Sequence, residues 1–105
     1  MTKHIVMWNF KPEIKEEEKE EIRTNMKNNL CSLVGQVPGL INAQFVEVPL
    51  SSSTHDMALV TDFDSAESLG GYKNHPAHVH VANTYVRPFV WERACLDYDI
   101  DDRTI

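Results

Sequence analysis

Residues 72–78 read Tyr-Lys-Asn-His-Pro-Ala-His and place a phenol, two imidazoles and a proline next to one another. Proline fixes φ near the helical value, suits the first turn of a helix and pushes the residue before it toward an extended backbone. We therefore expect one helix to end near Asn74 and another to begin at Pro76, with His75 at the junction. We expect this break to direct the side chains of Tyr72, His75 and His78 toward one place.

Four segments on either side of this junction have the apolar alternation that is typical of β-strands. They are residues 4–10, 40–48, 55–63 and 92–100. One face of the first segment consists of His4, Val6, Trp8 and Phe10, and its other face is also fairly apolar, which predicts a central strand covered on both sides. An apolar face of the second segment consists of Ile41, Ala43 and Phe45. The apolar face of the last segment consists of Ala94, Leu96, Tyr98 and Ile100.

Helical spacing of apolar residues predicts a long helix between the first two strands. It starts in the charged run 15–21 and closes at Gly35 and the Pro38-Gly39 pair. Its apolar stripe consists of Ile22, Met26, Leu30, Leu33, Val34 and Val37. A shorter helix is expected over 65–73, and a third runs from Pro76 to about Val86.

The helix expected over 65–73 has a strong start and a weak interior. Asp64 or Ser65 is the predicted cap, with Glu67 reaching back as in a capping box. The Gly70-Gly71 pair costs up to ~1 kcal/mol per residue relative to alanine in a helix interior. Two interpretations stay open: a neighbouring element or ligand approaches closely at this pair, or the helix is simply weak.

These elements give the order β-α-β-β-α-β, in which the second helical segment is broken at Pro76. The order is that of the ferredoxin-like split βαβ motif. It predicts an α+β fold with a four-stranded antiparallel sheet and its helices on one face. Nothing within the chain is expected to cover the other sheet face, and an exposed apolar sheet face needs a partner. We therefore expect self-association through that face.

Composition limits the class of protein and its partners. The 105 residues, 42% of them hydrophobic, suit one domain over 1–105, with 101–105 as a loose tail. A net charge of −6 without a Lys/Arg-rich stretch argues against nucleic acid and anionic membranes as partners. We expect a cytoplasmic protein, because neither a signal peptide nor a run of ~20 apolar residues is found. Cys31 and Cys95 lack metal-type spacing, and whether they pair stays open.

Three segments together resemble the stress-responsive dimeric α/β-barrel (Dabb) family. They are Lys3-His4-Ile5-Val6, His55-Asp56-Met57-Ala58-Leu59-Val60 and the specific signature Tyr72-x-x-His75-Pro76-x-His78. The resemblance covers nearly the whole chain. It implies a homodimer whose two sheets form one barrel, with a pocket between sheet and helices in each subunit. It also implies a site, because a plant polyketide cyclase of this family has a pocket tyrosine and histidine that match Tyr72 and His78, and a histidine near them at the position of His4.

The residues themselves allow chemistry at this site. Imidazole titrates near neutrality and a phenol donates or accepts a hydrogen bond, so His78 is the predicted base and Tyr72 its partner or the ligand of a substrate oxygen. His4, Trp8 and His75 are the predicted substrate-binding residues. The alternative is that His75 and His78 cap the helix junction and bond backbone groups.

Three functions stay open. The first is a dimeric barrel protein that binds a small, partly apolar molecule of unassigned identity. The second is a cofactor-free cyclase or lyase of aldol type that acts on a polyketide-like carbonyl compound. The third is a structural stress protein without a pocket. None of them needs a metal, because His75, His78 and His80 are poorly spaced as ligands and the motif holds no carboxylate.

Overall fold

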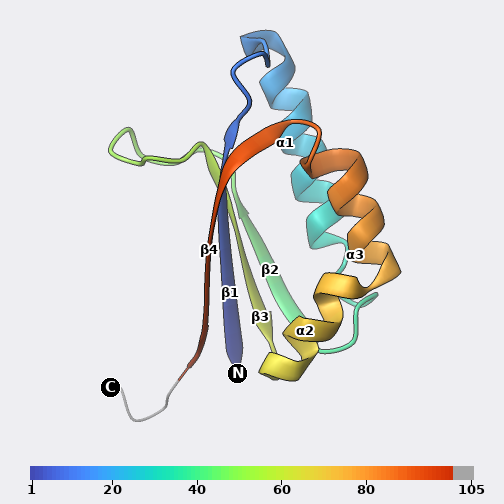
Figure 1. Cartoon of the computed structure of the whole chain (residues 1–105). Helices are drawn as coiled ribbons and strands as arrows, with labels where there is room; N and C mark the ends of the chain where they lie inside the picture. The colour runs from blue at the N-terminus through green and yellow to red at the C-terminus, as the bar shows by residue number, and fades with distance from the viewer. Residues whose placement is uncertain (101–105) are drawn as a thin grey trace.

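The computed structural model describes residues 1–100, whose architecture is a four-stranded antiparallel sheet with helices packed on one face (Figure 1). In chain order the elements are β1 (Thr2–Phe10), α1 (Glu16–Cys31), β2 (Leu40–Val46), β3 (Met57–Phe63), α2 (Ala66–Asn74), α3 (Pro76–Val81), the π-helical turn η1 (Ala82–Val86) and β4 (Val90–Asp99). The strand order is β2-β3-β1-β4. This is the predicted ferredoxin-like fold. The tail predicted at 101–105 lies outside the described residues.

Strand β1 lies at the centre of the sheet, between β3 and β4. Its alternation places His4, Val6, Trp8 and Phe10 on the helix-covered face, where all four are buried. Met57, Leu59, Thr61 and Phe63 of β3 share this face and are buried as well. The core therefore forms between the sheet and the apolar stripe of α1, where Met26 has no exposed surface.

The other side of the sheet has no helix over it among residues 1–100 (Figure 1). Register places Ile5 between Val60 and Leu96, and Met7 between Ala58 and Ala94. We call this surface the open sheet face; it consists of Ile5, Met7, Ala58, Val60, Ala94, Leu96 and Tyr98. Leu96 is 59% exposed, so an apolar surface faces outward as predicted. The outer face of β1 is only half-buried, so nothing within residues 1–100 supplies the cover predicted on that side.

Two predicted elements differ from the structure for local reasons. Helix α1 ends at Cys31 rather than near Gly35, because the Ser32 hydroxyl donates to the Asn29 carbonyl (2.8 Å) and such side-chain bonds compete with a helical backbone. In β2 the pairing register shifts between Leu40 and Asn42. This bulge turns Ile41 outward, so the predicted face shared by Ile41 and Phe45 is wrong.

The helix junction before Pro76 forms as predicted. The helices on either side of it differ from the prediction at one point each. Ser65 caps α2 by accepting from the Ser68 backbone N–H (3.1 Å), and Ser68 rather than Glu67 occupies the third helical position. Beyond Pro76 the helix reaches Val86, but its last turn is π-helical, with Arg87 N donating to the Ala82 carbonyl (2.8 Å). The π turn widens the helix beside the pocket described below.

The structure also describes the surroundings of the Gly70-Gly71 pair, the state of the two cysteines and the character of the helices. A Cβ at Gly70 or Gly71 would meet no atom of a neighbouring element within 4 Å, so no other element of the described chain approaches closely there. Neither Cys31 nor Cys95 forms a disulfide within residues 1–100. None of the helices in this part of the chain has the length and apolar character that crossing a membrane requires.

Candidate functional site

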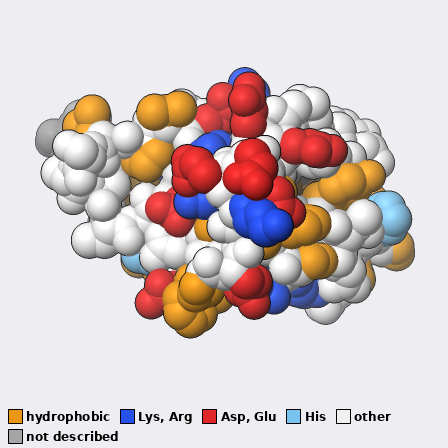
Figure 2. Space-filling view, turned by 90° about the horizontal axis from the view of Figure 1, so that it is seen from above, with side chains coloured by type: hydrophobic (Ala, Val, Ile, Leu, Met, Phe, Trp, Pro, Cys, Tyr) orange, Lys and Arg blue, Asp and Glu red, His pale blue; other side chains and the backbone are white. Residues whose placement is uncertain are grey.

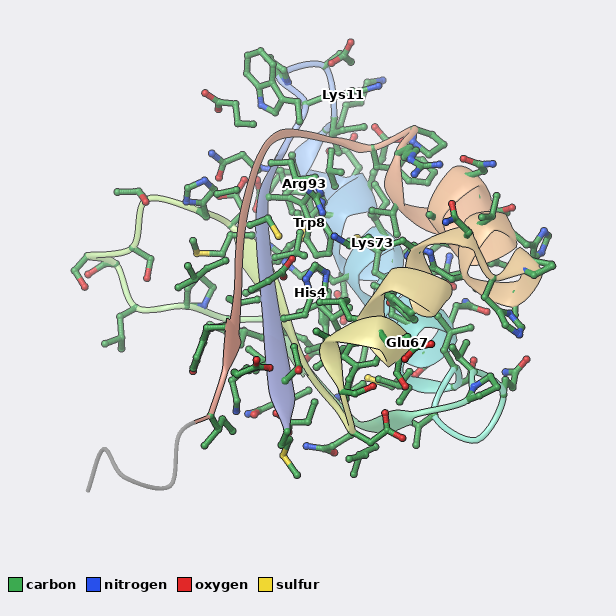
Figure 3. The ribbon with its side chains drawn as sticks, turned by 60° about the horizontal axis from the view of Figure 1, so that its bottom comes forward. His4, Trp8, Lys11, Glu67, Lys73 and Arg93 are labelled. Carbon is green, nitrogen blue, oxygen red and sulfur yellow. The ribbon has the colours of Figure 1, made fainter. Side chains whose placement is uncertain are left out.

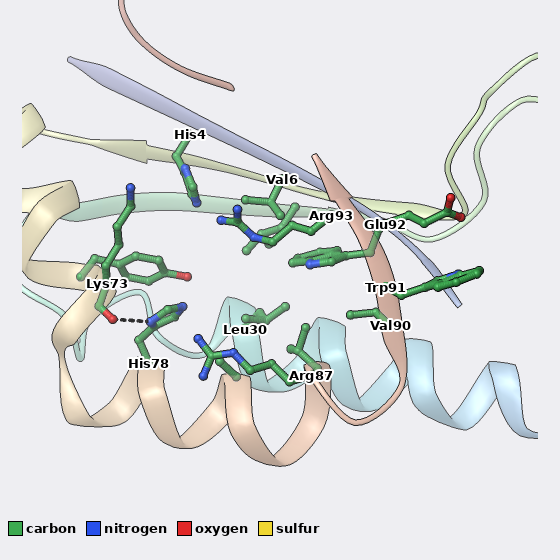
Figure 4. A pocket seen from close by; sticks show the side chains of 15 residues that line it. His4, Val6, Leu30, Lys73, His78, Arg87, Val90, Trp91, Glu92 and Arg93 are labelled. Atoms are coloured by element: carbon green, nitrogen blue, oxygen red, sulfur yellow. Dashed lines mark hydrogen bonds between the residues drawn. The ribbon is translucent and has the colours of Figure 1, made fainter. Parts of the chain in front are cut away.

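A cavity of about 240 Å³ lies between the buried face of the sheet and the helices, with its mouth along β4 (Figure 4). Its lining residues come from β1, α1, β3, the segment from α2 to the residue after η1, and β4: His4, Val6, Trp8, Leu30, Leu59, Tyr72, Lys73, His78, Ala82, Val86, Arg87, Val90, Trp91, Glu92 and Arg93. Of the sequence-predicted residues, the structure brings together His4, Trp8, Tyr72 and His78 here. Figure 3 shows His4 and Trp8 beside Lys73 and Arg93, between the strands and the helices.

His75, which was predicted with these residues, does not line this cavity. Its extended backbone ends α2, and its Nδ1 accepts a hydrogen bond from the Ala77 backbone N–H (3.1 Å). An imidazole held in this way satisfies a free donor of the first turn of α3. The capping alternative therefore describes His75, and its predicted role in substrate binding gains no support from this cavity.

Tyr72 and His78 meet because the chain breaks between them. Their ring centroids lie 4.1 Å apart, with a 35° angle between the ring planes. The Tyr72 ring also packs edge-on against Phe63 (5.1 Å) and is 2% exposed. Burial raises the pKa of Tyr72 well above its usual value. The phenol therefore stays protonated at neutral pH, where it can act as a hydrogen-bond donor to a ligand.

The orientation of His78 assigns its tautomer. Nδ1 lies 3.3 Å from the Lys73 carbonyl oxygen, which can only accept, so Nδ1 carries the proton and Nε2 keeps a lone pair. Figure 4 shows the ring reaching into the cavity. Burial lowers the pKa of His78, and the positive charges of Arg87, His4 and Arg93 lower it further, against the opposing effect of the Lys73 carbonyl. His78 is thus a neutral imidazole at pH 7, in the form that accepts a proton.

His4 is positioned by Asp97, its register partner on β4. His4 Nδ1 hydrogen-bonds an Asp97 carboxylate oxygen, and the other oxygen lies 3.5 Å from Lys73 Nζ. Burial raises the pKa of Asp97, but the hydrogen bond and charge of His4 outweigh it and hold that pKa below its usual value. Because Nδ1 is engaged, Nε2 is the His4 nitrogen that remains for a ligand. The His4 and Tyr72 ring centroids are 6.4 Å apart.

Asp97 is a site residue that was not predicted from the sequence; it lies on the last strand, on the face opposite Leu96 and Tyr98. The β1–β4 register pairs it with His4, and no local signal reveals that register. With Cys95 the two residues form a cluster whose potential ligand atoms lie within 4.8 Å of one another, so the geometry could hold a metal ion. In the structure Cys95 Sγ donates to Asp97 (3.4 Å), and the absence of a metal requirement stays a prediction.

The rest of the cavity divides into an apolar wall and a charged mouth. Aliphatic side chains from five elements form the wall: Val6, Leu30, Leu59, Val86 and Val90. Lys73, Arg87 and Arg93 stand at the mouth, where sequence reasoning had assigned no function to them. Arg87 donates to the Asn83 side-chain oxygen, a neutral partner. The site can therefore hold an apolar body while offering imidazole, phenol and guanidinium groups to its polar part.

Comparisons with known proteins identify a matching family model and similar folds. The model of a family described as the stress responsive A/B barrel domain matches residues 2–100. A search of curated proteins finds no match to the chain.

Solved structures share the fold at low sequence identity. A dimeric protein of unknown function with a ferredoxin-like fold from Bacteroides fragilis is 24% identical, with a TM-score of 0.85 over 94% of this chain and 95% of that one. A protein from Arabidopsis thaliana is 21% identical, with a TM-score of 0.76 over 97% of both chains. A hydroxynitrile lyase from Passiflora edulis is 16% identical, with a TM-score of 0.70 over 96% of this chain and 94% of its own. These likenesses show the fold alone.

Proposed function

The chain belongs to the stress responsive A/B barrel domain family, and we propose that it binds a small, partly apolar molecule in the pocket between its sheet and its helices. One observation carries the proposal: His4, Tyr72 and His78 converge beside the aliphatic wall of a single cavity. Small-molecule sites typically combine an apolar lining with a few placed polar groups. A purely structural protein needs no such convergence.

We also propose that residues 1–105 form one domain, located in the cytoplasm, that assembles as a homodimer through the open sheet face. Its apolar strips run across three neighbouring strands, and a second copy would remove them from water. The relative from Bacteroides fragilis is described as dimeric, which supports the same arrangement.

Ligand binding is tested by a thermal-shift screen followed by NMR mapping of the ligands that raise the melting temperature. We expect amide shifts to cluster at residues 4, 72 and 78. His78→Ala should weaken binding, whereas His80→Ala should not, because His80 lies on the same helix but is exposed and outside the cavity. Ligands whose shifts lie only on the open sheet face would contradict the proposal.

A second candidate function is a cofactor-free lyase or cyclase of aldol type, with a polyketide-like carbonyl compound as substrate. The tautomer of His78 favours it, because the lone pair on Nε2 can take a proton from the carbon next to a carbonyl. The imidazole becomes imidazolium, and the Tyr72 hydroxyl donates a hydrogen bond to the oxygen that gains negative charge. A structural relative bears the name hydroxynitrile lyase, which supports assaying C–C bond chemistry in this fold.

Proton abstraction is tested with a simple ketone, 4-phenyl-2-butanone, in deuterated water. We expect the protein to accelerate exchange of the hydrogens next to the carbonyl, His78→Ala to abolish that acceleration, and His80→Ala to retain it. Tyr72→Phe should slow exchange by ~10²-fold or more, as loss of an oxyanion donor does in other enzymes. Equal exchange in His78→Ala and in the unchanged protein would refute this candidate function and leave the binding proposal standing.

A further inference from the structure

The charged side chains that line the pocket are mostly cationic, although the chain as a whole is acidic. The chain holds 10 lysines and arginines against 16 aspartates and glutamates, and its acidic side chains gather where α1 begins, with Glu16, Glu17 and Glu18 in the first turn (Figure 2). The pocket lining reverses this balance, with three cationic side chains and one carboxylate. The cations are Lys73, Arg87 and Arg93, and the carboxylate is Glu92.

Glu92 does not neutralise these cations. Its carboxylate accepts a hydrogen bond from the Asn9 side chain (3.2 Å) at the opposite face of β4. The backbone reason is the irregularity of the β1–β4 register between Met7 and Asn9, where Glu92 adopts a left-handed conformation (φ 52°). Figure 4 shows Glu92 turned away from the cavity and Arg93, the next residue, turned into it. The bulge thus separates an acid from a base that are neighbours in sequence.

The two guanidinium groups approach the cavity from opposite walls (Figure 4). Arg93 extends from β4 near His4, and Arg87 extends from the end of η1 near His78. Within residues 1–100, no carboxylate lies within 4 Å of either guanidinium. Lys73, in contrast, forms an ion pair with Asp97. Both charges reach His78, whose pKa they lower. The mouth therefore carries uncompensated positive charge directed at the residues of the proposed site.

We propose that the ligand of this pocket carries a carboxylate, which Arg87 and Arg93 bind at the mouth while its apolar body lies on the aliphatic wall. The inference rests on the proposed ligand binding and specifies its chemistry. Guanidinium groups match a carboxylate geometrically and form charge-assisted hydrogen bonds with it. The small, largely aliphatic cavity favours a compact aromatic or aliphatic acid. A bound carboxylate also counters the charges of Arg87 and Arg93 at His78, which raises the pKa of that imidazole.

Three probes with the same apolar body test the proposal: 4-phenylbutyrate, its neutral amide and the cationic 4-phenylbutylamine. Calorimetry at fixed low salt should give an affinity for the acid at least about tenfold higher than for the amide. The amine should bind more weakly than the amide. An NMR titration should show the His78 pKa rising with bound acid and not with bound amide.

The variants Arg87→Gln and Arg93→Gln should each lower the affinity for the acid about fivefold or more and leave the affinity for the amide unchanged. Lys27→Gln is the control, because it changes the net charge equally but lies on α1, paired with Glu47 (3.3 Å) and outside the cavity. It should bind all three probes as the unchanged protein does. Melting temperatures identify any variant that fails to fold, and charge reversal at the same positions then serves in its place.

The outcomes separate this inference from the function on which it rests. Equal affinities for acid and amide, or the same loss of acid binding in Lys27→Gln as in the arginine variants, would overturn the carboxylate assignment and leave ligand binding intact. If no probe binds and the screen finds no ligand that maps to residues 4, 72 and 78, both the assignment and the proposed function fail.

Discussion

His78→Ala separates a functional histidine from a structural one, because the structure bounds what the imidazole contributes to folding. The side chain makes one hydrogen bond, to the Lys73 carbonyl at 3.3 Å, and one ring contact, to Tyr72 at 4.1 Å. A hydrogen bond of this kind contributes about 0.5–1.5 kcal/mol and an aromatic contact a similar amount. The bond is long and the ring is only half-buried, so we expect a loss of about 1–2 kcal/mol.

The comparison is Leu59→Ala in the same cavity wall. Leu59 is 2% exposed, and truncating a leucine buried to this degree costs about 2–5 kcal/mol. Urea unfolding followed by tryptophan fluorescence, at one fixed protein concentration, gives both values. His80→Ala, an exposed position on α3, should change the free energy of unfolding by less than about 0.5 kcal/mol.

The pH dependence gives a second, independent readout. The lowered pKa of His78 means that the unfolded chain binds this proton more readily than the folded one. His78 therefore destabilises the fold as the pH falls below 6.5, the ordinary pKa of a histidine, and has no such effect at higher pH. His78→Ala should lose stability less steeply below that pH than the unchanged protein does. A variant that unfolds outright, or that costs as much as Leu59→Ala, would show that His78 is a structural residue first.

Three further outcomes are expected. Sedimentation at micromolar concentration should give about twice the 12.0 kDa chain mass, and Leu96→Glu on the open sheet face should lower it; a stable folded monomer of the unchanged chain would rule out the dimer. Because the Asp97 pKa is lowered in the folded protein, its carboxylate stabilises the fold above about pH 4, and this stabilisation is lost as the pH falls through the lowered pKa. Asp97→Asn should therefore melt at a lower temperature than the unchanged protein above about pH 4, and the melting temperatures of the two proteins should converge in acid. Metal analysis of protein purified without a tag should find less than one zinc per chain; stoichiometric zinc would instead point to the cluster of His4, Cys95 and Asp97.

Much of the fold was predictable because its determinants are local. The alternation in β1 and β3 follows from the pleat, which sends successive side chains to opposite faces. The break before Pro76 follows from the proline ring itself. The errors occurred where one extra residue or one side chain changed a local pattern. The bulge at Ile41 reversed its face, and the Ser32 hydroxyl ended α1 early.

The site was predictable only in part. Tyr72 and His78 are six positions apart across a helix junction, so sequence alone could bring them together, and their rings do meet. The sequence did not reveal that His75 caps α3 instead of lining the cavity, because a histidine at an N-cap and one in a pocket have the same sequence signature. Asp97 and Arg93 had no signal in the sequence, because their roles depend on the register in which β4 pairs with β1. Arg87 had none either, because its role depends on how the end of η1 packs beside the cavity.

The sequence by itself determined the elements and their order, the helix junction at Pro76 and the excess of acidic residues. Each of these depends on a residue and its near neighbours, or on composition. Only the tertiary structure decided that Asp97 faces His4 and that the bulge at Glu92 turns Arg93 into the cavity. The physical reason is that a strand's side chains alternate with a period of two, so a one-residue change of register moves every group to the other face of the sheet.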